Sequence, residues 1–196
     1  SQRTSILEGK TTSTFAYRSN ILGPTIRAFR GEMLIASVQN ALSEPTNVHW
    51  HGLKVPANMD GNPVDIVKAG ESFQYSFPID QRAGTHWYHP HPHGATARQV
   101  HNGLAGILII NDDEELALGL PAGDFEVPLV IQDKRLKAGK LVYDPSMMET
   151  MTGYFGQTIT VNGVASPFHE AQGRWYRLRI LNGSTARVYN LALSPN

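Results

Sequence analysis

The chain has 196 residues, of which 41% are hydrophobic and 17% are charged, and its 17 basic residues balance its 17 acidic ones. This composition supports a packed core, excludes a largely disordered chain, and argues against nucleic acid as the main partner, because phosphate binding needs a basic excess. There is no cysteine, which excludes disulfides and metal–thiolate sites, and the longest apolar stretch, Leu104–Ile110, is too short to span a membrane.

Short strands separated by Gly- and Pro-containing turns are expected throughout residues 1–112. Ser72–Ile79 places Phe73, Tyr75, Phe77 and Ile79 on one face at period two, which indicates a half-buried strand. Further strands are expected at Thr25–Phe29, Met33–Asn40, Asn47–His51, Thr85–His89 and Leu104–Asn111. This spacing predicts an all-β domain, a β-sandwich with Greek-key connections, over residues 1–112.

The composition changes after residue 112. Residues 113–126 begin with acidic side chains and end among Gly and Pro, and we expect a linker with one helical turn. A second series of strands is then expected at Val127–Gln132, Thr158–Asn162, Trp175–Leu181 and Val188–Leu193. Residues 127–196 therefore predict the N-terminal portion of a second domain, whose sandwich is incomplete at residue 196.

Six of the eight histidines fall in two clusters, residues 49–51 and 86–93, and each cluster is followed by glycine. Residues i and i+2 of a strand point to the same side, about 6–7 Å apart, so two such pairs on neighbouring strands present four imidazoles to one space. Imidazole suits copper and zinc. His49, His51, His89 and His91 are therefore candidate metal ligands, and the alternatives are structural histidines or a zinc or metal-scavenging site.

The other histidines predict less. His93 is expected to support neighbouring ligands, although a direct ligand or a surface residue are alternatives. His86 is out of register with His89 on a strand, which favours a structural role. His101 and His169 are isolated in the sequence and are interpreted as surface or core residues.

These two motifs, His49-Trp50-His51-Gly52 and Trp87-Tyr88-His89-Pro90-His91, resemble the first two copper motifs of the laccase-like multicopper oxidases. Within that family, the sequence is most similar to bacterial copper-efflux oxidases, which oxidise cuprous ion. The likeness covers nearly the whole chain and continues in Gly23-Pro24-Thr25-Ile26, Asp60-Gly61, Arg98-Gln99-Val100, Gly103-Leu104-Ala105-Gly106, Val130–Lys134, Asn162-Gly163 and Arg177–Gly183. It implies a cupredoxin-like first domain followed by the start of a second one.

The resemblance also implies a role for each ligand. By position in the family's motifs, His49 corresponds to a ligand of type 2 copper, whereas His51, His89 and His91 correspond to ligands of type 3 copper. Asp60 matches a position that the family associates with proton delivery, which suits a reaction that consumes protons. The alternative for Asp60 is a turn residue before a glycine.

Two further groups are expected near or away from this site. Trp50, Trp87 and Tyr88 are expected to pack around the metal and restrict solvent. The three methionines of residues 147–151 offer soft ligands for cuprous ion, but loop or core filling is the preferred interpretation, since the family's methionine-rich site lies in a later domain.

The resemblance thus implies the N-terminal part of an oxidase that takes electrons from cuprous ion or a phenol and passes four to dioxygen. The resemblance implies that a C-terminal domain, severed or separately encoded, supplies the type 1 copper and the other cluster ligands on His-x-x-His-x-His and His-Cys-His motifs. It also implies a periplasmic or extracellular location. The alternatives are a copper-free relative of the oxidases in the cell envelope, or a small copper store.

Overall fold

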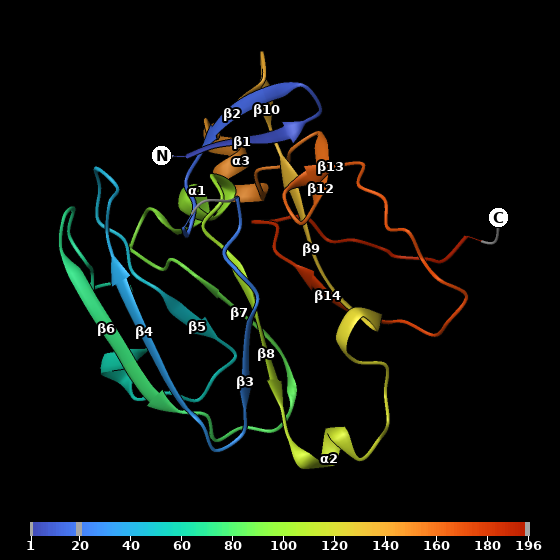
Figure 1. Cartoon of the computed structure of the whole chain (residues 1–196). Coiled ribbons are helices and arrows are strands. Elements are labelled where there is room, and N and C mark those ends of the chain that lie inside the picture. Colours follow the sequence, from blue (N-terminus) through green and yellow to red (C-terminus); the bar gives the residue numbers. More distant parts are fainter. Residues whose placement is uncertain (1, 19–20, 195–196) are drawn as a thin grey trace.

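The computed structural model describes residues 2–18 and 21–194. Its first part is built on two sheets that face one another (Figure 1). One sheet has the order β3 (Ile26–Phe29), β8 (Gly106–Asn111), β7 (Gly84–His89) and β5 (His49–His51). The other pairs β4 (Met33–Gln39) with β6 (Ser72–Pro78) in antiparallel register. This arrangement confirms the expected β-rich fold.

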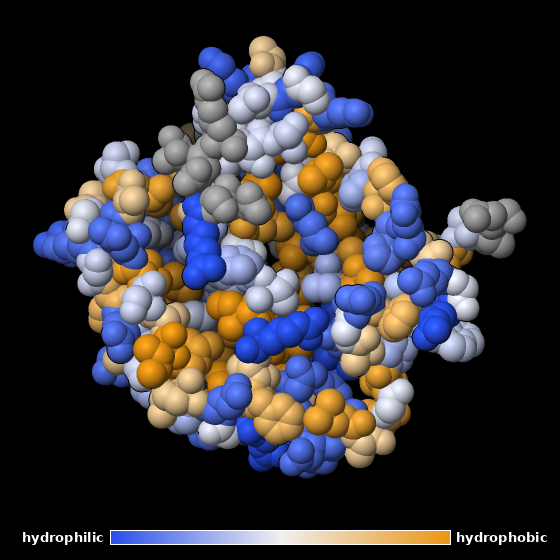
Figure 2. Space-filling model, in the orientation of Figure 1, coloured by the Kyte–Doolittle hydropathy of each residue, from blue (hydrophilic) through white to orange (hydrophobic). Residues whose placement is uncertain are grey.

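The core between these two sheets follows the period-two pattern of β6. Tyr75, Phe77 and Ile79 are buried and pack with residues of the facing sheet, such as Trp50 and Leu108. Phe73 lies on the same face, with its ring centroid 4.7 Å from that of Tyr75, but it is near the start of β6 and is 38% exposed. On the outer side of this sheet, Met33 and Ile35 are exposed, and apolar side chains gather over β4 and β6 at the lower left of Figure 2.

Tyr88 on β7 fills a space that two glycines leave open. A Cβ atom at Gly106 would lie 2.1 Å from the Tyr88 ring, and one at Gly23 would lie 2.0 Å from its hydroxyl oxygen. The hydroxyl donates to the carbonyl of Pro24 at 2.7 Å. This hydrogen bond fixes the Gly23-Pro24 segment against the sheet. A larger residue at position 23 or 106 would displace the Tyr88 ring.

A short helix, α2 (Asp113–Leu116), follows β8, so the expected helical turn is present. The Asp112 side chain caps it by accepting from the N–H of Glu115 at 2.8 Å. A 3-10 turn, η2 (Gly123–Phe125), then leads into the next strand. Glu115 is buried, unlike a solvated linker residue, because Arg177 and Arg179 pair with it.

The second part of the chain forms one sheet in the order β13 (Val164–Ala165), β12 (Thr158–Val161), β9 (Glu126–Lys134) and β14 (Arg177–Asn182). The strand expected at Val188–Leu193 is wrong: no strand is formed there. A strand needs a hydrogen-bonding neighbour. Within the described residues, β14 is the edge strand of this sheet, and residues 188–193 pair with no strand.

Several elements had no clear signal in the sequence. They are the hairpins β1 (Gln2–Leu7) with β2 (Lys10–Thr14) and β10 (Leu136–Lys137) with β11 (Lys140–Leu141), the turn η1 (Ala57–Met59), and the helices α1 (Thr96–His101) and α3 (Met147–Thr152). None of the helices in the described residues is long and apolar enough to cross a membrane.

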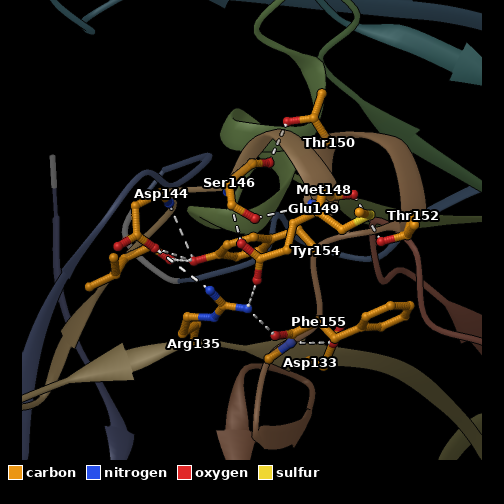
Figure 3. A network of polar contacts seen from close by, with 12 residues as sticks. Asp133, Arg135, Asp144, Ser146, Met148, Glu149, Thr150, Thr152, Tyr154 and Phe155 are labelled. Carbon is orange, nitrogen blue, oxygen red and sulfur yellow. Dashed lines mark hydrogen bonds and ion pairs between the residues drawn. The ribbon is translucent and has the colours of Figure 1, made fainter.

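Helix α3 is held by a network of polar contacts that Figure 3 shows from close by. Ser146 and Glu149 form a reciprocal capping box at its start, and Glu149 also pairs with Arg135 at 2.5 Å. The Arg135 guanidinium in turn lies 3.9 Å from the centre of the Tyr154 ring. The three methionines of residues 147–151 lie on this helix and are exposed, so the core-filling interpretation is wrong for them.

The two parts of the chain share an apolar interface and a charged one. Val130 of β9 packs against Ile107 and Ile109 of β8 in one buried cluster. Beside it, Arg179 of β14 donates to Glu126 at 2.7 Å and to Glu115 at 2.8 Å. Burial by itself raises the pKa of Glu126, but its arginine hydrogen bonds outweigh burial and lower it.

A buried lysine makes a third connection. Lys134, at the end of β9, donates from Nζ to the carbonyl of His101 at 2.6 Å. That carbonyl belongs to the last residue of α1, so the lysine satisfies a helix-terminal acceptor. Helix α1 directly follows the second histidine cluster in the sequence. The contact therefore connects the sheet that contains β9 to the segment that follows this cluster.

Candidate metal centre

The site is built on the pairing of two short strands. In the register of β5 and β7, His49 lies opposite His89 and His51 lies opposite Trp87. Side chains alternate between the faces of a strand, so His49, His51 and His89 share one face. The other face of the same strands carries Trp50 and Tyr88, which enter the sandwich core.

His91 reaches the cluster from the loop after β7. The ring centroids of His49 lie 5.6 Å from His51, 5.3 Å from His89 and 5.1 Å from His91. The His89 and His91 rings are 5.9 Å apart. The structure thus gathers all four histidines that the sequence singled out.

The spacing of ring nitrogens fits a metal. One nitrogen from each of His49, His51 and His89 lies within 4.8 Å of the other two. Nδ1 of His51 and Nε2 of His89 are 3.2 Å apart, close to the roughly 3.3 Å expected for two nitrogens on one tetrahedral ion with bonds of about 2.0 Å. Nδ1 of His91 is buried without a hydrogen-bond partner, a further polar atom that a ligand would satisfy.

Hydrogen bonds fix which nitrogen of two rings is free. Nδ1 of His49 lies 2.9 Å from the carbonyl oxygen of Asp60 and 3.0 Å from its Oδ1, so this nitrogen donates. Nδ1 of His89 likewise donates to the carbonyl of Pro90 at 2.8 Å. In the neutral tautomer that these contacts select, Nε2 of each ring is unprotonated, which is the form that binds a metal.

Burial favours the neutral form that metal binding requires. Desolvation, and then the nearby His49, lowers the pKa of His51. Desolvation also lowers the pKa of His89 to about 4, outweighing the hydrogen bond to Pro90, which raises it. Both imidazoles are therefore neutral at pH 7 and need lose no proton to bind a cation.

The cluster lies at the surface. His89 is buried and His49 and His91 are half-buried, but His51 is exposed. Further ligands can therefore approach the cluster from the side of His51.

Only one of the three aromatic residues expected around the metal touches the histidines. The Trp87 ring lies 4.1 Å from the His89 ring and 5.2 Å from the His51 ring, centre to centre. Trp50 and Tyr88 point into the core instead, and that part of the expectation is wrong. The alternation of side chains on a strand was the signal for this, because Trp50 stands between two histidines.

The other histidines lie outside the four-ring cluster. His93 is exposed, and His86 packs against Gly52 and Gly84, where added Cβ atoms would lie 2.8 and 3.1 Å from its ring. His101 is buried beside Tyr143 and Tyr154, and the ring of exposed His169 contacts Tyr176.

One buried polar residue at the site had no signal in the sequence. Asn47 is fully buried, and its side chain contacts both the segment after Asp60 and the backbone of His91. Asn47 stands just before the first histidine motif, but a single asparagine in a strand-like stretch does not predict a contact.

Comparison with known proteins places this geometry in a family. Residues 1–115 match the family model described as multicopper oxidase. A multicopper oxidase of Staphylococcus aureus is 40% identical over 99% of this chain, and a cell division protein, FtsP, of Xenorhabdus nematophila is 41% identical over 88% of it.

Solved structures agree with these matches. A laccase-like multicopper oxidase, CueO, from Ochrobactrum sp. superposes with a TM-score of 0.89 at 41% identity, covering 94% of this chain and 42% of its own. The multicopper oxidase McoA from Aquifex aeolicus gives a TM-score of 0.86 at 40% identity, with 94% and 41% covered. The chain spans 43% of the length of the S. aureus relative and 37% of the X. nematophila one.

Proposed function

Because the chain belongs to the multicopper oxidase family, we propose that it supplies half of a copper cluster at which dioxygen is reduced to water. The observation that carries the proposal is the four-histidine cluster, in which Nδ1 of His49 and of His89 each meets a backbone carbonyl and leaves Nε2 to bind a metal. Imidazole nitrogens suit copper, and copper held there would supply the one-electron steps by which dioxygen is reduced.

Each histidine has a proposed place. His49, which stands apart by its contact with Asp60, would hold the type 2 copper. His51 and His89, whose facing nitrogens are 3.2 Å apart, would share a type 3 copper. His91 would hold the second type 3 copper, and Trp87 would shield the buried side of the pair.

Asp60 has two proposed tasks. Its carbonyl oxygen accepts from Nδ1 of His49 at 2.9 Å, which would hold that ring in the tautomer whose Nε2 can bind a metal. Its carboxyl group is also half-buried next to the cluster, where it would deliver protons that oxygen reduction consumes. The turn at η1 places it there, since Asp60 is the residue that ends this turn.

Further domains would complete the site. The relatives are more than twice as long as this chain, and the cluster is open on the side of His51. We propose that a C-terminal domain brings the other cluster ligands and the type 1 copper that receives electrons from cuprous ion or a phenol. We also propose a periplasmic or extracellular location, which cell fractionation would test.

The experiment is metal analysis of the complete protein, with visible and electron paramagnetic resonance spectra. We expect blue colour, a type 2 signal and oxygen uptake with cuprous ion or a phenol as reductant. A complete protein that binds no copper under these conditions would refute the proposal.

A second candidate function follows from the similarity to the cell division protein of X. nematophila. A role in assembling the cell envelope would need the fold but no copper. Retention of four histidines in one volume favours the oxidase. Replacing the four histidines distinguishes the two functions. The replacement would abolish oxidase activity, whereas a role in envelope assembly would be retained.

A further inference from the structure

Asn47 is a fully buried asparagine whose side chain is saturated with hydrogen bonds. Its Nδ2 donates to the carbonyl oxygens of Gly61, Asn62 and Asp65 at 3.0, 2.8 and 3.1 Å. Its Oδ1 accepts from the backbone N–H of His91 at 2.6 Å. Unpaired, each of these buried groups would cost about 1–3 kcal/mol, so the contacts strongly constrain both segments.

The loop that accepts these hydrogen bonds is pressed against the first histidine strand. A Cβ atom at Gly61 would lie 2.1 Å from the carbonyl oxygen of Val48 and 3.0 Å from the N of His49. Gly61 also has a φ of +61°, which favours glycine. Asp60 directly precedes Gly61. The distance between this loop and the strand therefore determines the position of Asp60 relative to His49.

Three segments that carry functional groups therefore meet at one side chain. Asn47 precedes His49 by two residues, holds the loop that follows Asp60, and holds the peptide of His91. We propose that Asn47 is a positioning residue, which sets the separation of His91 and Asp60 from His49. The inference rests on the proposed copper-binding function.

The alternative is that Asn47 only stabilises the fold, as buried asparagines in turns commonly do. The chain offers a matched case in Asn40, which is 2% exposed. Its Nδ2 donates to the carbonyls of Glu44 and Val67 at 2.8 and 2.9 Å, and its Oδ1 accepts from the N–H of Leu42 at 2.9 Å. These contacts join loops that hold none of the four histidines.

The test compares Asn47→Asp, Asn47→Leu and Asn40→Asp in the complete protein. Aspartate at position 47 still accepts from the N–H of His91 but cannot donate to the loop carbonyls. Leucine, which has a similar shape, can neither accept from His91 nor donate to the loop. The readouts are thermal unfolding, copper content, the type 2 paramagnetic spectrum, and crystal structures of the metal-free proteins.

We expect Asn47→Asp to shift the type 2 spectrum and to weaken type 2 copper binding about 10-fold or more, the scale seen when residues that orient ligands are replaced. Asn47→Leu should weaken type 3 binding as well. Asn40→Asp should lower the unfolding temperature to a similar degree and leave both spectra as in the parent.

Equal losses of stability with unchanged copper content and spectra in all three variants would overturn the proposal. If the parent itself binds no copper, the proposed function fails, and the metal-free crystal structures still decide this inference. They should then show the 5.1 Å separation of the His49 and His91 rings altered by Asn47→Leu and kept by Asn40→Asp. An unaltered separation in Asn47→Leu would refute the positioning role.

Discussion

His49 and His89 are direct cross-strand neighbours, and the centroids of their rings lie 5.3 Å apart. The pairing aligns the first histidine of each motif, so both motifs present their rings to the same face. Side chains alternate along a strand, and a slip of one residue would therefore put Trp50 opposite His89 and direct the histidines of β5 into the core.

His49 should be essential for one class of copper. We expect His49→Ala in the complete protein to lose the type 2 signal, with a loss of affinity above the 10–100-fold typical of residues that only orient a ligand. The type 3 absorption should remain. Metal analysis and paramagnetic resonance measure both, with exposed His169→Ala as the control. Full oxidase activity in His49→Ala would contradict the assignment.

Asp60→Asn separates the two tasks proposed for Asp60. The backbone carbonyl of residue 60 still accepts from Nδ1 of His49, but the asparagine side chain carries no proton to deliver. We expect unchanged copper content and a fall of about 100-fold in the rate of oxygen uptake, within the usual range for general acid–base catalysis. Asp60→Ala, which keeps the same carbonyl, should also lose turnover and keep its type 2 copper. Normal turnover in Asp60→Asn would leave Asp60 as a turn and orienting residue.

His101 should make the protein less stable in mild acid. Burial, followed by the charge of Lys134, lowers the pKa of His101 to about 4. Below the unfolded value of about 6.5, protonation favours the unfolded chain, so stability present above pH 6.5 is lost as pH falls towards 4.

The loss from His101 alone amounts to roughly 2 kcal/mol at pH 5. Replacing it with phenylalanine, which keeps a ring between Tyr143 and Tyr154, should therefore flatten the decline between pH 7.5 and 5. Denaturant unfolding of the metal-free protein at the two pH values measures it. An equally steep decline in His101→Phe would show that other groups cause it.

Arg179 should be critical to the joint between the two parts of the chain. Arg179→Met leaves Glu115 and Glu126 buried with fewer partners, and we expect a loss of about 3 kcal/mol in stability. Arg30 is the control, since its 4.0 Å contact with Glu114 is exposed and should contribute less than about 1 kcal/mol. Chemical unfolding measures both, and equal effects would contradict a special role for the buried network.

Much of the candidate site could be predicted from the sequence because it depends on local geometry. The spacing of His49 and His51 places both rings on one face in any strand, and the motifs identify the family. The strands of the first sandwich followed from alternation and turns. The strand expected at Val188–Leu193 failed for the opposite reason, since pairing depends on a neighbour that local sequence does not specify.

The tertiary structure decided which groups meet across the chain. The register of β5 and β7 opposes His49 to His89. The packing of Gly61 on Val48 brings Asp60 to His49, and Asn47 joins that loop to His91. These contacts form because buried hydrogen-bonding groups need partners, and those partners lie far apart in the sequence. The periodicity of hydrophobic residues along the chain does not indicate which groups will pair.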